Sequence, residues 1–132
     1  MILVDTSAWV EYDRASGSDV DLRLTEHIRS GGGDIAVTEP VLMEVLAGAR
    51  DQAGTAQLRR LLTSFGWLPV DAVADFEGAA KVYRSCRDAG ITPRGLIDCM
   101  IASIAIRTGS GLLTADRDFT AMAGVVPLRL AR

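Results

Sequence analysis

The sequence is poor in the residues that build disulfide frameworks and zinc sites. Its 132 residues include two cysteines and one histidine, His27. There is no Cys-x-x-Cys pair, so a zinc site rich in cysteine and histidine is excluded. Cys86 and Cys99 lie in helical patterns, which predicts small, reduced core residues.

Long apolar runs are also lacking. No run reaches the roughly 18 residues that a membrane span needs. The opening stretch MILVDTSAW has neither the basic region nor the small-residue cleavage site of a signal peptide. We therefore expect a cytoplasmic protein with no membrane partner.

The basic residues are almost all of one kind, although the net charge is small. The formal net charge is −3, which gives no overall electrostatic footprint of nucleic-acid binding. Yet 13 of the 14 basic residues are arginine, and Lys81 is the exception. Arginine suits phosphate recognition because its planar fork binds two oxygens at once. Codon bias in a GC-rich genome explains the same count, so both interpretations stay open.

The pattern of apolar residues predicts one α/β domain over residues 1–132. With 48% hydrophobic residues the chain can bury a substantial core. Short apolar runs alternate with helical patterns, which favours a three-layer α/β/α sandwich around a mainly parallel sheet of about five strands. Strands are expected at 1–5, 35–38, 67–70, 111–114 and 125–130, and helices at 7–14, 19–31, 39–50, 55–66, 72–90, 92–109 and 116–124.

One acid lies inside the most apolar helical stretch, GLIDCMIASIAI at 95–106. At about 100° per residue, the neighbours of Asp98 on its own face are apolar or small. The polar residues Ser103 and Arg107 lie about 140° and 180° away by the same periodicity. Asp98 is therefore not expected on the solvent face, and an ion pair with Arg94 is the simplest structural explanation.

Other acids are placed where strands end. Asp5 and Asp116 follow the first strand and the strand at 111–114, and Glu44 lies on the helix after the strand at 35–38. Helix capping explains Asp5 and Asp116 separately, and Asp118 suits a first helical turn. In a parallel sheet, however, these ends share one edge, where ligands bind.

Carboxylates gathered at that edge repel one another and raise their own pKa values. A hard divalent cation removes this conflict, because Mg²⁺ and Mn²⁺ prefer oxygen ligands and complete their coordination with water and phosphate. Such a site activates water and aligns a phosphodiester for attack. The acids together therefore indicate metal-assisted phosphoryl chemistry.

Four segments carry a resemblance that spans nearly the whole chain: ILVDTSAWVEY, TEPVLMEVLAGAR, RGLIDCMIASIA and LLTADRDF. In this order and spacing they resemble the PIN-domain ribonucleases, and within them the VapC-like toxins of type II toxin–antitoxin pairs. The resemblance implies a PIN-like fold and a Mg²⁺- or Mn²⁺-dependent endoribonuclease. It further implies cleavage of RNA, such as tRNA or another structured RNA, that inhibits translation and growth.

The resemblance also implies roles for particular residues. It makes Asp5, Glu44 and Asp98 an acidic triad, Asp116 the fourth acid and Asp118 an additional metal ligand. Thr6 and Thr114 fall where family members place a hydroxyl near the site. The implied partners are a VapB-like antitoxin, whose C-terminal segment covers the site, and a second copy of the chain in a homodimer.

These residues suggest a mechanism. Asp5, Asp98 and Asp116 are expected to hold the ion, and Glu44 to orient a metal-bound water or act as its general base. Attack by water leaves a 5′-phosphate and a 3′-hydroxyl. The basic residues Arg94 and Arg117 can contact RNA phosphate or pair with neighbouring acids, and the sequence does not distinguish the two.

Two other functions compete with the nuclease. A metal-dependent phosphatase or phosphoacceptor domain also has an aspartate after its first strand, but VDTS lacks the second aspartate of that phosphatase class, and Lys81 is the one lysine available to a receiver domain. A binding module of the same fold has no use for clustered negative charge that faces phosphate. Both alternatives explain less of the acidic pattern.

Overall fold

Four short parallel strands form the sheet in a computed structural model that describes residues 1–131. The strands are β1 (Ile2–Val4), β2 (Ile35–Val37), β3 (Gly66–Trp67) and β4 (Gly111–Leu113), in the order β3-β2-β1-β4. All three pairings are parallel, and Leu3 of β1 is paired with Ala36 and with Leu112. The carboxyl ends of the strands therefore meet at one edge of the sheet.

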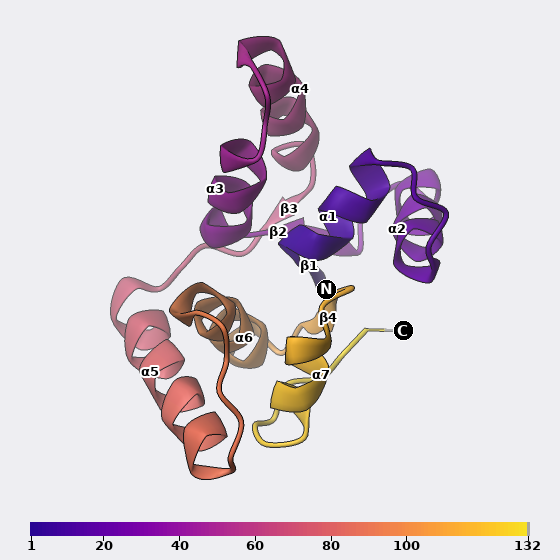
Figure 1. Ribbon diagram of the computed structural model, residues 1–132. Helices are drawn as coiled ribbons and strands as arrows, with labels where there is room; N and C mark the ends of the chain where they lie inside the picture. The colour runs from indigo at the N-terminus through magenta and orange to yellow at the C-terminus, as the bar shows by residue number, and fades with distance from the viewer. Residues whose placement is uncertain (132) are drawn as a thin grey trace.

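Seven helices connect and cover the strands within the described residues: α1 (Thr6–Asp13), α2 (Asp19–Arg29), α3 (Glu39–Ala47), α4 (Gln52–Leu62), α5 (Ala72–Asp88), α6 (Leu96–Thr108) and α7 (Arg117–Ala123). In Figure 1, α5 and α6 run side by side on one side of the sheet, and α1 and α2 lie on the other. This confirms the predicted α/β fold with helices on both faces. Helix α1 follows β1 directly, as α3 follows β2 and α7 follows β4, so all three begin at the same edge.

The sheet is smaller than the sequence predicts, with four strands rather than about five. The strand expected at 125–130 is reduced to one bridge, in which Leu130 pairs with Leu112 of β4. Pro127 lacks the backbone N–H that a longer ladder needs. Strand β3 covers residues 66–67 instead of 67–70, and its pairing ends before Pro69 for the same reason.

The helix that carries Asp98 is shorter than predicted. Helix α6 begins at Leu96, whereas the pattern extended it back to residue 92. Pro93 precedes the helix, and Gly95 is its N-cap, with an extended backbone and no side chain to close the first turn. At its other end Gly109 adopts a left-handed conformation, with φ of 66°, that terminates the helix as expected for glycine.

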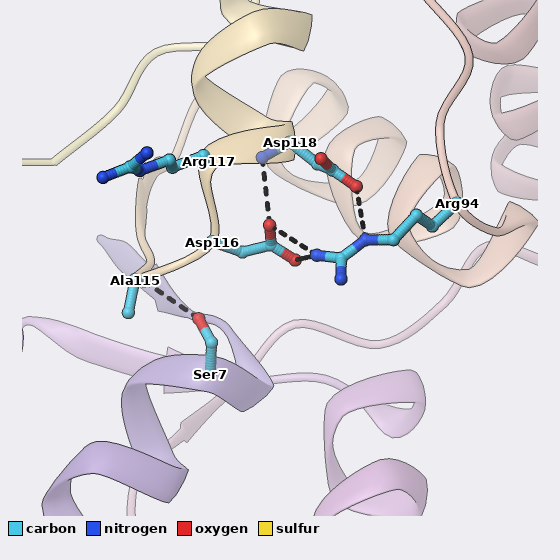
Figure 2. A pocket seen from close by; sticks show the side chains of 6 residues that line it. All are labelled: Ser7, Arg94, Ala115, Asp116, Arg117 and Asp118. Atoms are coloured by element: carbon cyan, nitrogen blue, oxygen red, sulfur yellow. Dashed lines mark hydrogen bonds and ion pairs between the residues drawn. The ribbon is translucent and has the colours of Figure 1, made fainter.

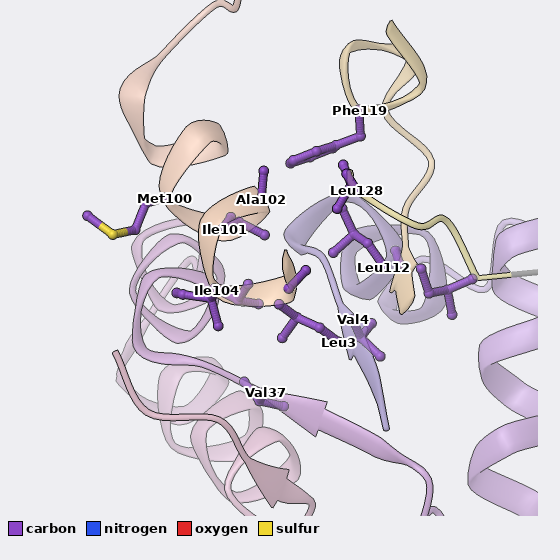
Figure 3. Packing of buried hydrophobic residues seen from close by; sticks show 14 of the residues in the cluster. Leu3, Val4, Val37, Met100, Ile101, Ala102, Ile104, Leu112, Phe119 and Leu128 are labelled. Atoms are coloured by element: carbon purple, nitrogen blue, oxygen red, sulfur yellow. The ribbon is translucent and has the colours of Figure 1, made fainter. Parts of the chain in front are cut away.

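Helix α6 lies in the centre of the hydrophobic core. All residues from Cys99 to Ala105 are buried, and Ile101 and Ile104 lie near Leu3 of β1 in Figure 3. Helix α5 approaches α6 closely, because a Cβ on Gly78 would collide with the side chain of Ser103. This packing fixes the position of α6, which carries Asp98 in its first turn.

Among residues 1–131, no helix combines the length and the apolar character that crossing a membrane requires.

Candidate active site

Asp5 lies at the carboxyl end of β1 and is 3% exposed. It is the N-cap of α1, and its Oδ2 accepts hydrogen bonds from the hydroxyl groups of Ser7 (2.7 Å) and Thr114 (2.9 Å). Burial raises the pKa of Asp5 above its ordinary value, although these hydrogen bonds oppose the increase. The cap that the sequence suggests and a position in the site are therefore compatible.

A small hydroxyl network ties this carboxylate to the loop after β4. The hydroxyl groups of Ser7 and Thr114 are 3.1 Å apart. The backbone N–H of Ala115 donates to Ser7 Oγ, and that of Asp116 donates to Thr114 Oγ1, both at 2.9 Å. The network fixes the positions of Asp5 and Asp116 relative to each other.

Ser7 is a site residue that the sequence interpretation missed, since it singled out Thr6 and Thr114. The available signal is its place two residues after a strand-end aspartate. In that position a capping carboxylate accepts from the backbone N–H, here at 3.3 Å from Ser7 N to Asp5 Oδ2. Capping arguments alone do not predict that the Ser7 hydroxyl also reaches a loop more than 100 residues away.

Asp116 and Asp118 lie at the start of α7. Asp116 is the N-cap and accepts a hydrogen bond from the backbone N–H of Asp118 at 2.9 Å. Their side chains are 19% and 33% exposed. Asp118 is in the first turn of the helix, as the sequence suggests, and its carboxylate points toward the same space as that of Asp116 (Figure 2).

Arg94 is the basic partner of these two acids. Its Nη2 donates to both carboxylate oxygens of Asp116 at 2.8 Å, and its Nε donates to Asp118 Oδ2 at 2.7 Å. The alternative in which Arg94 pairs with Asp98 is wrong, because Asp98 has no ion pair or side-chain hydrogen bond within residues 1–131. Arg117 lines the same pocket as Arg94, but it points away from the carboxylates in Figure 2.

Asp98 is half-buried in the first turn of α6. Its pKa is raised to about 6, first by burial and then by the negative charges of Asp5, Asp116 and Glu44, while Arg94 lowers it. These acids, drawn from four segments of the chain, are therefore close enough to act on one another. The expected mutual repulsion is present at the strand edge.

Glu44 lies on α3 and is half-buried. Its Oε1 accepts a hydrogen bond from the hydroxyl of Thr6 at 2.7 Å. Thr6, which the family resemblance places near the site, therefore orients Glu44. One carboxylate oxygen of Glu44 is fixed in this way, and the other has no hydrogen bond from the described residues.

The carboxylates of Asp98, Asp116 and Asp118 form a group suited to a cation. Each offers an oxygen, and these oxygens lie within 4.8 Å of one another. Carboxylate oxygens are the kind of donor that a hard divalent ion prefers. Asp5, also predicted as a ligand, lies outside this group of three, and its Oδ2 already accepts from two hydroxyl groups.

Comparison with known proteins shows the family to which the chain belongs. The family model described as "PIN domain" matches residues 2–125. The chain is 43% identical over 131 residues to "VapC ribonuclease Mb1587" of Mycobacterium bovis and to "Ribonuclease VapC11" of Mycobacterium tuberculosis, and the match covers 99% of this chain and 98% of each relative.

The chain belongs to the PIN-domain family, among the VapC ribonucleases.

Solved structures of this PIN fold superpose over nearly the full length. VapBC2 from Rickettsia felis, bound to a DNA fragment from its promoter, matches with a TM-score of 0.76 and 19% identity, over 99% of this chain and 98% of that one. VapC20 of Mycobacterium tuberculosis, described as a sarcin–ricin loop cleaving toxin, matches with a TM-score of 0.71 and 21% identity, over 98% and 99%. At these identities the likeness shows the shared fold.

Proposed function

We propose that this PIN-domain chain is a divalent-metal-dependent endoribonuclease and the toxin of a VapBC-type toxin–antitoxin pair. The observation that carries the proposal is the convergence of Asp98, Asp116 and Asp118 at the strand edge, beside Asp5 and Glu44. The ribonuclease relatives at 43% identity support RNA as the substrate. We expect the chain to act in the cytoplasm, where translation takes place.

Mg²⁺ or Mn²⁺ fits the donor set, which consists of carboxylate oxygens without histidine or cysteine. Asp98, Asp116 and Asp118 would hold the ion, with Asp5 as a further ligand or as support through water. When bound, the ion supplies positive charge that stabilises the phosphoryl transition state and makes water more acidic.

Glu44 is suited to the role of general base. The hydrogen bond from Thr6 fixes one of its oxygens, and the second oxygen remains available to accept a proton from the attacking water. Asp5, Ser7 and Thr114 keep the strand edge rigid, so that the carboxylates retain their positions when substrate binds. In-line attack by water leaves a 5′-phosphate and a 3′-hydroxyl.

Arg117 extends the site toward the substrate. It is exposed beside the acidic pocket and has no ion pair within residues 1–131, so its guanidinium is available to an RNA phosphate. Recognition of tRNA or another structured RNA fits a site this open, and its cleavage would inhibit translation and growth.

The proposal includes two protein partners. Structures with this fold are described as VapBC complexes, such as that from Rickettsia felis, and as a toxin–antitoxin complex from Klebsiella pneumoniae. They motivate a VapB-like antitoxin that covers the acidic site, and a homodimer of the toxin. Co-purification from cells that express both genes, followed by measurement of the mass of the complex, tests both.

The test of activity is cleavage of total RNA by the purified chain with Mg²⁺ or Mn²⁺. EDTA is expected to abolish cleavage, and Asp98→Asn to reduce it at least about a hundredfold, because a weakened hold on the ion removes electrostatic stabilisation of the transition state. Asp88→Asn, an exposed aspartate at the end of α5, is the matched control and should cleave normally. Products with 2′,3′-cyclic phosphate ends, or activity that survives EDTA, would exclude this mechanism.

A further inference from the structure

The guanidinium of Arg94 is hydrogen-bonded to two of the carboxylates that a cation would need. It makes three hydrogen bonds of 2.7–2.8 Å, to both oxygens of Asp116 and to Oδ2 of Asp118. These are two of the three acids whose oxygens converge. Figure 2 shows the side chain reaching across the pocket to them from the segment before α6.

A guanidinium and a divalent cation cannot both be held fully by these oxygens. Each positive charge attracts the carboxylates, and the two charges repel each other strongly at the separation that shared ligands impose. An ion between Asp98, Asp116 and Asp118 therefore weakens the hold on Arg94, and Arg94 weakens the hold on the ion. Linkage requires that the two effects be equal.

Arg94 is placed so that it can leave. Its side chain is 71% exposed, and the residue lies in the irregular stretch between α5 and α6. Within residues 1–131, its side chain hydrogen-bonds to Asp116 and Asp118 alone. When it swings into water, water satisfies its N–H groups, so no buried polar group loses a partner.

We propose that Arg94 is a built-in competitor of the catalytic cation: it bridges Asp116 and Asp118 in the metal-free protein and is displaced when the ion binds. The bridge neutralises part of the acidic cluster while the ion is absent. Displacement sets a guanidinium free at the rim of the site, where it can contact a phosphate of the substrate. This inference rests on the proposed metal-dependent function and names a regulation of the same site.

The test measures Mn²⁺ binding by titration calorimetry without RNA, so that it does not depend on activity. We expect Arg94→Ala to bind Mn²⁺ about tenfold more tightly than the natural chain, the order of magnitude for relief of one like-charge contact at a partly exposed site. Arg94→Lys keeps the charge but loses the bidentate contact. Its affinity for Mn²⁺ should lie between those of the natural chain and Arg94→Ala. Arg117→Ala removes an arginine from the same pocket without breaking an ion pair, and should change the affinity much less.

Thermal unfolding gives a second readout that also checks folding. Without metal, Arg94→Ala should melt at a lower temperature than the natural chain, because the acids then repel without their bridge. With saturating Mn²⁺ the difference should shrink or reverse. A purely structural role for Arg94 would lower the melting temperature equally in both conditions and would contradict the proposal.

The outcomes distinguish this inference from the proposed function. Equal Mn²⁺ affinity in Arg94→Ala and the natural chain, or weaker affinity in the variant, overturns the competitor role and leaves the nuclease proposal intact. Failure of the natural chain and of Arg94→Ala to bind Mn²⁺ overturns both. Tighter binding by Arg94→Ala and Arg117→Ala to the same extent reflects the loss of any positive charge, and also overturns the specific role of Arg94.

Discussion

Individual acids of the candidate site combine a structural role, the capping of a helix, with a position suited to catalysis. Asp5 and Asp116 cap α1 and α7, as helix-capping preferences predict, and the negative charges of both raise the pKa of Asp98. A cap at the end of a strand fixes the carboxylate by local hydrogen bonds before any ion is present. The capping interpretation and the functional one were alternatives in the sequence, and the geometry is compatible with both.

The raised pKa of Asp98 predicts that the stability of the metal-free protein depends on pH. Its pKa is about 6 in the folded chain and 3.8 in its unperturbed state, so the folded state binds the proton more tightly. Folding is therefore penalised where Asp98 is ionised, above about pH 6, and the penalty disappears as the pH falls through 6 toward 4. Asp98→Asn removes the charge and should stabilise the chain at pH 7.5 by about 1–3 kcal/mol.

Denaturant unfolding in EDTA at pH 7.5 and at pH 4.5 measures this effect. The advantage of Asp98→Asn should be clear at the higher pH and mostly lost at the lower one. Asp88→Asn is the matched control, because that aspartate is exposed and outside the cluster. An advantage independent of pH would mean that the asparagine stabilises by some means other than the removal of charge.

Among the helices, α6 shows where the sequence prediction succeeds and where it fails. The face that carries Asp98 was predicted correctly, whereas the environment of the opposite face was predicted wrongly. The periodicity placed Asp98 away from Ser103 and Arg107, which holds, but it treated those residues as the polar side of the helix. Ser103 is buried, and both donate to Asp75, a fully buried acid on α5. A helical pattern shows which residues share a face, whereas the neighbouring helix decides whether that face meets water.

The Arg107–Asp75 ion pair joins α6 to α5, and we expect it to contribute to the stability of the fold. Burial tends to raise the pKa of Asp75, but hydrogen bonds from Arg107, the backbone of Asp71 and Ser103 outweigh it and leave the pKa below its ordinary value. Arg107→Ala leaves this buried carboxylate without a cation and should lower the free energy of unfolding by about 2–4 kcal/mol. The exposed Arg84 of α5 is the control, and Arg84→Ala should change stability by about 0.5 kcal/mol or less.

Chemical denaturation of the two alanine variants at pH 7 compares them directly. Similar stability of the two would show that the ion pair contributes no more than a surface charge does. Because α6 carries Asp98, a loose α5–α6 contact should also weaken Mn²⁺ binding by Arg107→Ala at temperatures where the variant is still folded.

At the scale of the whole molecule, the parallel sheet brings the acids together. Asp5, Glu44, Asp98 and Asp116 are spread over more than 100 residues, yet three of them raise the pKa of the fourth. Strand ends that share an edge produce this proximity. The same arrangement makes the metal-free fold carry unfavourable charge repulsion, which a bound cation would relieve.

Divalent cations should therefore stabilise the folded chain as a whole. An ion present at about a hundred times its dissociation constant contributes about 2.7 kcal/mol, which corresponds to a rise of several degrees in melting temperature for a chain of this size. Calorimetric scans with Mn²⁺ and with EDTA measure the shift. Asp98→Asn should respond less than Asp88→Asn, and equal shifts in the two would exclude Asp98 as a ligand.

Local sequence patterns were enough to predict the alternation of strands and helices, the positions of Asp5 and Asp116 after strands, and the orientation of Asp98 away from Ser103. These properties are local, because they depend on periodicity, on helix capping and on the glycine and proline residues that end helices and strands, all within a few residues. Three-dimensional packing sets three further features: the pairing of Arg94 with Asp116 and Asp118, the contact of Ser7 with the loop after β4, and a sheet of four strands within residues 1–131. Such contacts join residues far apart in the chain, and they depend on how the helices pack and where each side chain is free to extend.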